Sequence, residues 1–257
     1  MAQSLFDLTG KVAVITGSTR GIGRAIAEAM ARAGASVVIS SRKDEQCVAV
    51  AQSITNEGLK ATPIACNIGK REDVERLVQL TKDHYGKIDS LVCNAAVNPY
   101  FGPLAGATDE AFTKTIDSNV RSNLWLSNLA IPEMAQRRDG SVIIVSSIGG
   151  LKGSSVLGLY AISKAADMQL VRNLAVEWGP SNVRANCIAP GLVKTDFARA
   201  LWEDPKTLAH AESVYPLRRI GDPEDVAGMA VLLASRAGAW ITGQTFVIDG
   251  GATIAGG

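Results

Sequence analysis

Tyr160 and Lys164 stand four positions apart in the stretch 156–178, whose apolar residues recur at helical spacing. Their side chains are therefore expected on one face of one helix. A free tyrosine titrates at about 10, and a neighbouring ammonium favours tyrosinate and brings the hydroxyl closer to acid–base chemistry at neutral pH. The pair predicts proton transfer to or from an oxygen atom. A pair of helix-surface neighbours without chemical function is the alternative.

A hydroxyl group is available close to this pair in the sequence. Ser147 follows the β-branched run 142–145, and Gly149 and Gly150 come after it. A serine at the end of a strand can donate a hydrogen bond to a carbonyl oxygen that Tyr160 also protonates, so that two donors meet the atom on which charge develops. Ser146 competes for this role, and a Ser–Ser pair is also ordinary turn composition.

A glycine-rich turn follows the first apolar run of the chain, 12–15. The turn consists of Gly17, Thr19, Arg20, Gly21, Ile22 and Gly23 with their neighbours. Glycines let the backbone turn tightly and approach a phosphate, and the N–H groups of a following helix point at the anion. An ordinary strand–helix turn is the alternative, but the complete strand–helix–strand unit over 12–40 favours a dinucleotide.

The end of the second apolar run, 36–40, indicates which dinucleotide binds. An acidic residue at this place accepts the ribose 2′-hydroxyl of NAD and rejects a 2′-phosphate. Here the chain has Ser41 followed by Arg42, and Arg20 lies within the glycine-rich turn. Two guanidinium groups can clamp a 2′-phosphate, which favours NADP(H) over NAD(H). Two solvated surface arginines are the alternative.

Two other strand ends carry small or amide side chains. Asn94, Ala95 and Ala96 follow the run 91–93. Such small residues suit a place where the backbone must lie close to a flat ligand group. A polar turn that needs small residues for packing is the alternative. Asn67, with Ile68 after it, follows the third run and is placed to meet adenine. A turn-forming asparagine is the alternative for Asn67.

The elements that must position these residues alternate regularly. Apolar, β-branched runs of strand length occur at 12–16, 36–40, 60–65, 89–93, 141–146, 182–188 and 244–248, with helical spacing between most of them. The 257 residues, 47% of them hydrophobic, therefore predict one α/β domain over 1–257, with a Rossmann-type doubly wound parallel sheet of about seven strands. The segment 192–222 lacks strand signals, and 194–215 is expected to form a substrate lid.

Composition excludes several classes of function. With 26 basic and 25 acidic residues the net charge is +1, unlike that of a nucleic-acid-binding protein. The four cysteines show no CxxC spacing and the two histidines are isolated, so no metal site is predicted. The sequence has no run of about 18 apolar residues, no leader peptide and no C-terminal Ser-Lys-Leu-type ending. We therefore expect no membrane segment, a cytoplasmic location and small-molecule partners.

Together, these motifs resemble the short-chain dehydrogenases/reductases over nearly the whole chain. They are Thr16-Gly17-x-x-x-Gly21-x-Gly23, Asn94-Ala95-Ala96, Asn119, Ser147, Tyr160-x-x-x-Lys164 and Pro190-Gly191. The resemblance implies that Tyr160 is the general acid/base, that Lys164 lowers the pKa of Tyr160 and holds the nicotinamide ribose, and that Ser147 orients the carbonyl. It also implies that Asn119 supports a water-mediated proton relay behind Lys164. The residues implied at the nicotinamide carboxamide are Pro190, Gly191, Val193 and Thr195.

Within the family, the motifs are most similar to NADP-dependent carbonyl/retinal reductases, which implies reduction of a ketone to a secondary alcohol. Two positions depart from the family pattern, because Ala96 replaces a usual glycine and Asn67 a usual aspartate. The expected substrate pocket is mostly apolar, which favours a small hydrophobic or cyclic ketone. It comprises 98–101, 149–151, Val156, Leu157, Phe197, Leu201 and Trp202, although plain packing of the lid explains these residues too.

Two other functions stay open at this point. A 3-oxoacyl thioester reductase would need a basic docking patch for an acyl carrier protein, for which Arg218 and Arg219 are the candidates. An NADP-binding sensor or scaffold without catalysis is disfavoured, because Ser147, Tyr160 and Lys164 are all present. The resemblance also implies a homotetramer, with helices near 108–135 and 156–178 at one interface and the strand 245–248 near another.

Overall fold

The computed structural model describes residues 4–255. Residues 1–3 and 256–257, which the predicted domain and the expectations about targeting signals include, lie outside the described part. The chain forms one seven-stranded parallel sheet in the order β3-β2-β1-β4-β5-β6-β7. The strands are β1 (Val12–Thr16), β2 (Ser36–Ser40), β3 (Lys60–Pro63), β4 (Ser90–Cys93), β5 (Gly140–Val145), β6 (Val183–Pro190) and β7 (Thr245–Ile248). All seven predicted runs are confirmed, with small shifts at their ends.

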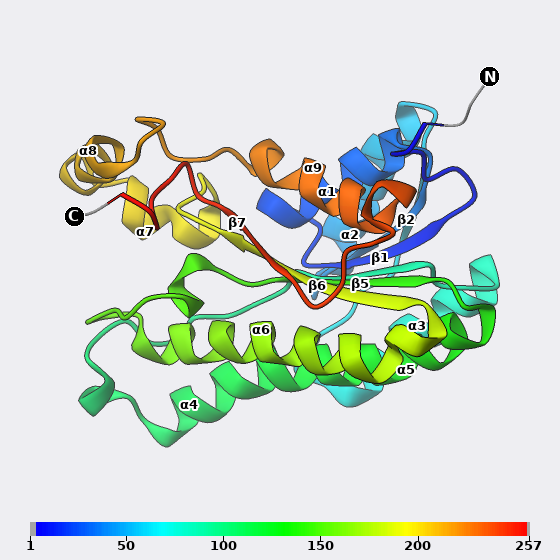
Figure 1. Ribbon diagram of the computed structural model, residues 1–257, viewed down its shortest axis with the longest axis horizontal. Helices are drawn as coiled ribbons and strands as arrows, with labels where there is room; N and C mark the ends of the chain where they lie inside the picture. Colours follow the sequence, from blue (N-terminus) through cyan, green and yellow to red (C-terminus); the bar gives the residue numbers. More distant parts are fainter. Residues whose placement is uncertain (1–3, 256–257) are drawn as a thin grey trace.

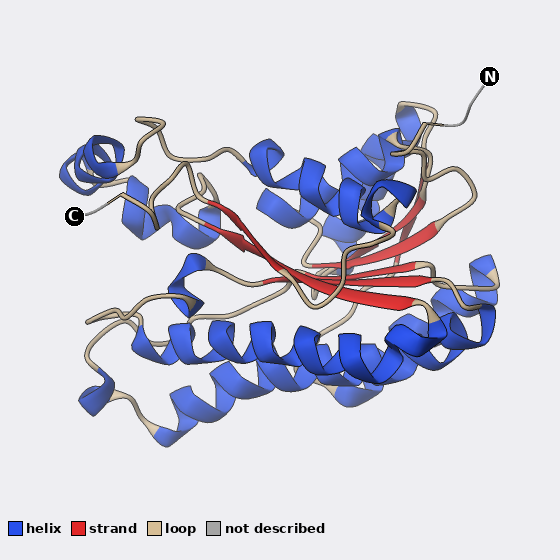
Figure 2. Cartoon of the chain, in the orientation of Figure 1, coloured by secondary structure: helices blue, strands red, loops and turns tan. Residues whose placement is uncertain are grey.

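Helices cover both faces of the sheet, as Figures 1 and 2 show. One face carries α1 (Gly21–Arg32), α2 (Asp44–Asn56) and α9 (Pro223–Ala234), and the other carries α3 (Arg71–Tyr85), α5 (Ser122–Arg137) and α6 (Gly158–Trp178). Successive residues of each strand point to opposite faces. Ala13 and Ile15 of β1 therefore pack with α1 and α9, whereas Val14 packs with α3 and α5. The predicted single-domain, doubly wound Rossmann-type fold is confirmed.

The turn from α1 into β2 shows how the sequence ends a helix. Helix α1 ends at Arg32, and Gly34 follows with φ +104°. L-residues rarely adopt this backbone conformation, and a Cβ on Gly34 would lie 2.6 Å from Thr9 Oγ1. Gly34 is therefore the residue at which the chain leaves α1 and turns toward β2.

The helix predicted over 108–135 consists of three consecutive parts. Thr108 caps α4 (Asp109–Ile116) by accepting a hydrogen bond from the Ala111 N–H at 3.2 Å. A π-helical turn, η2 (Asp117–Arg121), then leads into α5. A π-turn inserted in a helix displaces the carbonyls around it, and such turns are frequent at functional sites. Asn119 lies in this turn.

The segment 192–222 forms an insertion beyond the carboxyl end of β6, as predicted. It contains η5 (Asp196–Ala198), α7 (Arg199–Trp202) and α8 (Pro205–Val214), and a parallel bridge from Val193 to Gly221 closes it. In Figure 1, α7 and α8 lie at the left, away from α3. The remaining short helices are η1 (Leu104–Gly106), η3 (Ile148–Gly150), η4 (Gly179–Ser181) and η6 (Arg236–Gly238).

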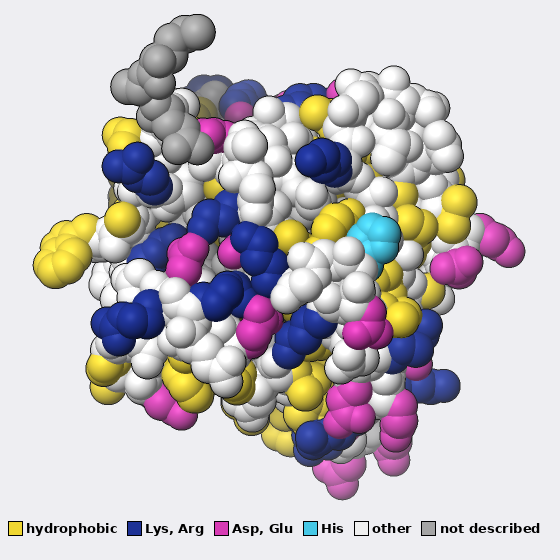
Figure 3. All heavy atoms as spheres, turned by 90° about the vertical axis from the view of Figure 1, so that its right-hand side faces the viewer, with side chains coloured by type: hydrophobic (Ala, Val, Ile, Leu, Met, Phe, Trp, Pro, Cys, Tyr) yellow, Lys and Arg dark blue, Asp and Glu magenta, His cyan; other side chains and the backbone are white. Residues whose placement is uncertain are grey.

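Figure 3 shows the end of the molecule opposite α7 and α8, where Lys and Arg side chains are interspersed with Asp and Glu. Charges of both signs on this face agree with the net charge of +1. Within residues 4–255, no helix is long and apolar enough to span a bilayer.

Candidate active site

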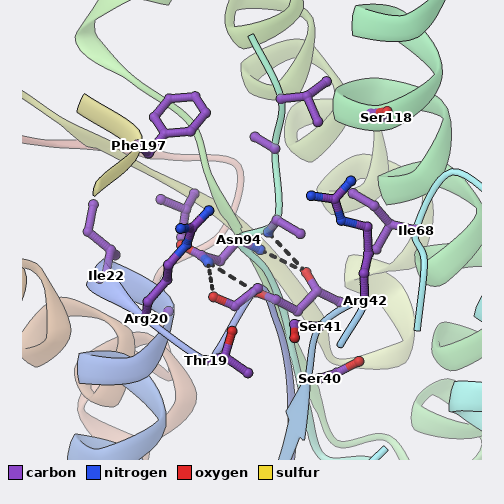
Figure 4. Close-up of a pocket in the computed structure, with 18 of the residues that line it drawn as sticks. Thr19, Arg20, Ile22, Ser40, Ser41, Arg42, Ile68, Asn94, Ser118 and Phe197 are labelled. Atoms are coloured by element: carbon purple, nitrogen blue, oxygen red, sulfur yellow. Dashed lines mark hydrogen bonds between the residues drawn. The ribbon is translucent and has the colours of Figure 1, made fainter. Parts of the chain in front are cut away.

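A cavity of about 400 Å³ lies at the carboxyl ends of the strands, next to β1 and β4. The strand order reverses between these two strands, which is where sheets of this type bind ligands. Figure 4 shows the cavity with Asn94 near its centre. Most of the predicted site residues line it: Gly17, Thr19, Arg20, Gly21, Ile22, Gly23, Ser41, Arg42, Asn67, Ile68, Asn94, Ala95, Ala96, Tyr160, Lys164 and Thr195.

Tyr160 and Lys164 lie together on α6 at one end of this cavity. The Lys164 Nζ atom is 5.7 Å from the centre of the Tyr160 ring. Lys164 is buried, and its ammonium donates hydrogen bonds to the Val145 carbonyl at 2.9 Å and to Asp167 Oδ2 at 3.0 Å. An ammonium has three donors. The third is therefore available for a hydroxyl group inside the cavity.

Burial raises the pKa of the Tyr160 hydroxyl, while Lys164 acts to lower it. Asp167 raises the pKa of Tyr160 further, and a hydrogen bond with Ser147 lowers it. The lowering effect predicted for Lys164 is thus present, but the net direction is upward because burial outweighs the ammonium. A raised pKa favours the protonated hydroxyl, which is the form that can protonate an oxygen.

The structure distinguishes the two adjacent serines. The Ser146 hydroxyl is buried and donates to the Lys164 main-chain carbonyl at 2.7 Å. The Ser147 hydroxyl accepts from the Gly149 N–H at 3.0 Å and also bonds the Tyr160 side chain, so it lies beside the hydroxyl that carries the proton. Ser147 is thus the serine suited to orient a carbonyl beside Tyr160, although it does not line the cavity wall itself.

Asn119 is buried, and its amide holds other parts of the chain. Its Oδ1 accepts from the Val97 N–H at 2.8 Å, and its Nδ2 donates to the Val97 carbonyl at 2.9 Å and to Ser163 Oγ at 3.0 Å. The Asn119 side chain therefore fixes the loop after β4 to α6. The water-mediated relay predicted for Asn119 stays a prediction.

The glycine-rich turn fits closely around Asn94. The Asn94 Nδ2 group donates to the carbonyls of Thr16 at 3.0 Å and Gly17 at 3.2 Å, and Thr16 Oγ1 accepts from the Asn94 N–H at 3.1 Å. A Cβ atom on Gly23 would overlap both Asn94 Nδ2 and the Gly17 carbonyl. The side chain of Asn94 thus stabilises the turn, the structural role left open by the sequence.

We expect Gly23→Ala to lower the free energy of unfolding by about 1–3 kcal/mol, because the added methyl group has no space. Gly228 in α9 offers a matched control, since a Cβ there meets nothing within 4 Å. Gly228→Ala should raise the stability by about 0.5–1 kcal/mol. Urea unfolding measures both, and equal stabilities of the two variants would contradict the close fit around Asn94.

The two arginines at the predicted ribose end do not converge. Figure 4 shows Arg42 on the side of Ile68 and Ser118, and Arg20 on the side of Ile22 and Phe197. Arg20 forms an ion pair with Asp196 of the insertion at 3.5 Å, whereas Arg42 has no such partner among residues 4–255. Both arginines line the cavity, and the clamp expected from the two guanidinium groups stays a prediction, with Arg42 the one that forms no ion pair among the described residues.

The other predicted contacts divide between the cavity and the protein interior. Asn67 Oδ1 accepts from the Gly69 N–H at 3.1 Å, as in an asparagine turn, and Asn67 lines the cavity. Val193 is buried in the core, and a Cβ on Gly191 would lie 2.8 Å from Asp249 Cβ. Pro190, Gly191 and Val193 do not line the cavity, but Thr195 does.

Comparison with known proteins shows the family to which this chain belongs. Residues 17–253 match the family model described as enoyl-(acyl carrier protein) reductase. Dehydrogenase/reductase SDR family member 4 from Sus scrofa is 45% identical over 95% of this chain and 88% of its own. The chain is a short-chain dehydrogenase/reductase. It is therefore an oxidoreductase, and its fold binds a nicotinamide cofactor.

Solved structures of this family agree with the fold. A gluconate 5-dehydrogenase from Burkholderia cenocepacia in complex with NADP and tartrate has a TM-score of 0.95 and 29% identity, over 100% of both chains. A 7α-hydroxysteroid dehydrogenase with NADH and 7-oxo glycochenodeoxycholic acid has a TM-score of 0.93 and 34% identity, over 98% of this chain and 97% of its own. These two structures thus differ in the cofactor and in the size of the second molecule that they hold.

Sequence reasoning missed several residues of this short-chain dehydrogenase/reductase. Gln46, Lys114 and Ser118 line the cavity, and the buried Asp167 contacts Lys164 directly. One signal for Asp167 was present in the sequence, since an acid three positions after Lys164 belongs to the same helix face.

The predicted apolar substrate residues are only partly at the cavity. Phe197 lines it, with its ring centre 6.0 Å from that of Tyr160. Trp202 instead donates its Nε1 hydrogen bond to the Thr195 carbonyl at 2.9 Å, and Lys194 lies over its ring. Packing within the insertion therefore explains Trp202, the alternative that the sequence left open.

Proposed function

We propose that this short-chain dehydrogenase/reductase reduces a small, largely apolar ketone with NADPH, with Tyr160 as the proton donor. The observation that carries the proposal is the position of Tyr160, beside the buried Lys164 ammonium and at the same cavity as the glycine-rich turn. One end of the cavity suits a dinucleotide, and the other presents a protonated hydroxyl group. The aromatic ring of Phe197 beside Tyr160 supports an apolar substrate.

The cavity fits a nicotinamide dinucleotide by its own features. No side chain caps the N-terminus of α1, so its N–H groups are free to bind a pyrophosphate. The Ser40 hydroxyl lines the cavity and is buried without a hydrogen-bond partner among the described residues. A bound cofactor would be held by these groups, by Lys164 and by Thr195, and would supply the hydride.

The protein residues around Tyr160 carry the proton chemistry. Ser147 is placed to donate a hydrogen bond to the substrate carbonyl, and Tyr160 delivers its proton to the same oxygen. Lys164 stabilises the negative charge left on the Tyr160 oxygen. The Val145 carbonyl fixes the position of Lys164 from the end of β5.

Arg42 supports NADPH over NADH, because it lies free at the end of β2, where Ser41 replaces an acid. The relative from Burkholderia cenocepacia, whose structure holds NADP, agrees with this choice, whereas the hydroxysteroid dehydrogenase holds NADH. NADPH is therefore the cofactor to test first.

We expect Arg42→Ala to raise the KM for NADPH roughly tenfold to a hundredfold, because it removes a charge-assisted hydrogen bond to the 2′-phosphate. The KM for NADH should change by less than about twofold, since NADH lacks this phosphate. Arg71→Ala, at an exposed arginine of α3, is the control. Equal effects on both cofactors would overturn the assignment of Arg42.

The test of the function is the oxidation of NADPH, followed by absorbance, with aromatic, cyclic and aliphatic ketones and a 3-oxoacyl thioester. Rapid turnover of a small apolar ketone supports the proposal. No turnover of any carbonyl, despite tight binding of NADPH, would reject it in favour of a sensor without catalysis.

Reduction of a 3-oxoacyl thioester is the second candidate, because the description of the matching family model, enoyl-(acyl carrier protein) reductase, names an acyl thioester as substrate, although at a C=C bond and not at a ketone. The proposed basic patch gives it little support. Arg219 forms a two-pronged ion pair with Asp225 at 2.5 and 2.9 Å, and Arg218 donates to the Ser213 carbonyl. Both arginines hold the turn before α9, so neither is free to bind an acidic carrier protein.

A homotetramer and a lid are parts of the same proposal. The exposed apolar side chains of Leu124, Ile162 and Val176 on α5 and α6 support one interface between copies of the chain, and the fully exposed Trp240 supports another near β7. The insertion 194–215 is proposed to cover the substrate, since Phe197 already reaches the cavity. The mass of the assembly in solution tests the homotetramer.

The cellular location stays a prediction, and one relative, from Homo sapiens, is named as mitochondrial.

A further inference from the structure

Asp167 lies behind Lys164, on the side away from the cavity. Its side chain is fully buried in the helix pair α5–α6, and it does not line the cavity. Its Oδ2 accepts from Lys164 Nζ at 3.0 Å, and its Oδ1 accepts from Asn123 Nδ2 at 2.9 Å. Each oxygen thus meets a donor, which is the arrangement that an ionised carboxylate requires.

Asn123 ties this carboxylate to the π-turn. Its Nδ2 group also donates to the Asn119 carbonyl at 2.6 Å, so one amide bridges η2 and Asp167. A continuous set of hydrogen bonds therefore runs from the main-chain carbonyl of Asn119 through the side chains of Asn123 and Asp167 to the Lys164 ammonium. This set occupies the space behind Lys164 and holds its ammonium from the side opposite the cavity.

The carboxylate also changes the charge that Tyr160 experiences. Lys164 alone would favour tyrosinate, whereas a negative charge within hydrogen-bond distance of the ammonium offsets much of that effect. Burial by itself would lower the pKa of Lys164, but Asp167 and Tyr160 together raise it, so the ammonium stays charged. The net direction of the Asp167 pKa is upward because of burial, while Lys164 and Asn123 oppose that effect and favour the carboxylate.

Other ionisable groups lie on α6 and on the elements around it. They are Cys93 on β4, Cys187 on β6, Arg172 on α6, Lys114 on α4, and Asp117 and Arg121 on η2. Burial raises the pKa of both thiols, so they are neutral. Asp117 and Arg121 pair with each other at 2.8 Å. The packed elements β5, η3 and α5 contribute neutral groups at this point, among them the Val145 carbonyl and Asn123.

We propose that Asp167, held by Asn123, is a positioning residue that fixes the Lys164 ammonium and offsets its charge, so that Tyr160 stays in the proton-donating form that ketone reduction needs. The inference rests on the proposed function for its chemical meaning. It also favours ketone reduction over alcohol oxidation, because the negative charge of Asp167 disfavours the tyrosinate form that alcohol oxidation needs.

The test is a pH titration of Tyr160 in the full-length protein, with and without NADP⁺. The difference in tyrosinate absorbance between each protein and its Tyr160→Phe version isolates Tyr160 from the other tyrosines. Asp167→Asn removes the negative charge, so the midpoint for Tyr160 should fall by about one pH unit. Asp167→Ser, a smaller neutral variant, should give the same shift if Asp167→Asn does not fold.

Activity gives a second readout. Reduction by NADPH needs protonated Tyr160, so its rate falls as the pH rises through the Tyr160 midpoint. In Asp167→Asn this fall should begin about one pH unit lower. Asp89→Asn is the control, because it makes the same chemical change at another buried carboxylate. Asp89 lies just before β4 and bonds to the Val12 N–H and to Lys87, not to Lys164. It should leave both midpoints unchanged.

The outcomes separate the two proposals. An unchanged or raised Tyr160 midpoint in a folded neutral variant would overturn the role of Asp167, whatever the activity. A lowered midpoint without turnover of any ketone would keep that role and reject the proposed reaction. A lowered midpoint with the matching shift in the rate profile supports both.

Discussion

Tyr160→Phe should lower the turnover of ketone by about 10²–10⁴-fold, because it removes a positioned general acid and leaves the ring in place. The affinity for NADPH should change little, since the glycine-rich turn, Arg42 and Lys164 remain. The hydroxyl is the only atom group removed, so the loss belongs to the proton transfer. Single-turnover reduction with saturating NADPH measures it directly, apart from product release.

Tyr85→Phe is the matched control for this prediction. It makes the same chemical change on α3, where the Tyr85 hydroxyl contacts Thr62 Oγ1 at 2.7 Å. Turnover should stay close to that of the unaltered protein. A comparable rate in Tyr160→Phe would show that another group donates the proton, and the assignment of Tyr160 would then fail.

Lys164→Met should lower the free energy of unfolding by about 3–5 kcal/mol and also abolish turnover, because it leaves the Asp167 carboxylate buried without its cation. The double variant Lys164→Met/Asp167→Leu replaces the ion pair with apolar side chains of similar size. It should recover most of the stability, yet none of the activity. Denaturant unfolding and the NADPH assay together test both parts.

A small loss of stability in Lys164→Met, followed by no recovery in the double variant, would contradict this account. It would mean that Asp167 is protonated in the folded protein or reached by water. The two measurements thus distinguish a catalytic loss from a folding loss, which the single variant combines.

Local spacing explains why much of the site was predictable. Tyr160 and Lys164 share one helix, and Gly17, Gly21 and Gly23 share one turn, so the backbone periodicity alone brings each group together. Because the strands are parallel, the carboxyl ends of β1, β4 and β5 lie next to one another at the same end of the sheet. The seven strands and the doubly wound order followed from the same alternation.

Contacts between distant segments were not predictable in this way. Asn123 and Asp167 belong to different helices, and only the packing of α5 on α6 brings their side chains to 2.9 Å. The ion pair from Arg20 to Asp196 depends on where the insertion lies over the cavity, which no local pattern fixes. The net direction of the Tyr160 pKa was missed for the same reason, because burial arises from tertiary structure.

The bonds that Asn94 makes to the glycine-rich turn have a consequence for how cofactor association proceeds. Because Asn94, directly after β4, is hydrogen-bonded to Thr16 at the end of β1 and to Gly17, the conformation of the turn is set within the protein itself. Binding therefore loses little chain entropy at the phosphate-binding end, in the manner of a preorganised receptor. The two tasks of the turn thus fall to different residues: Asn94 and the glycines keep its shape, while Thr19 and Arg20 line the cavity that receives the ligand.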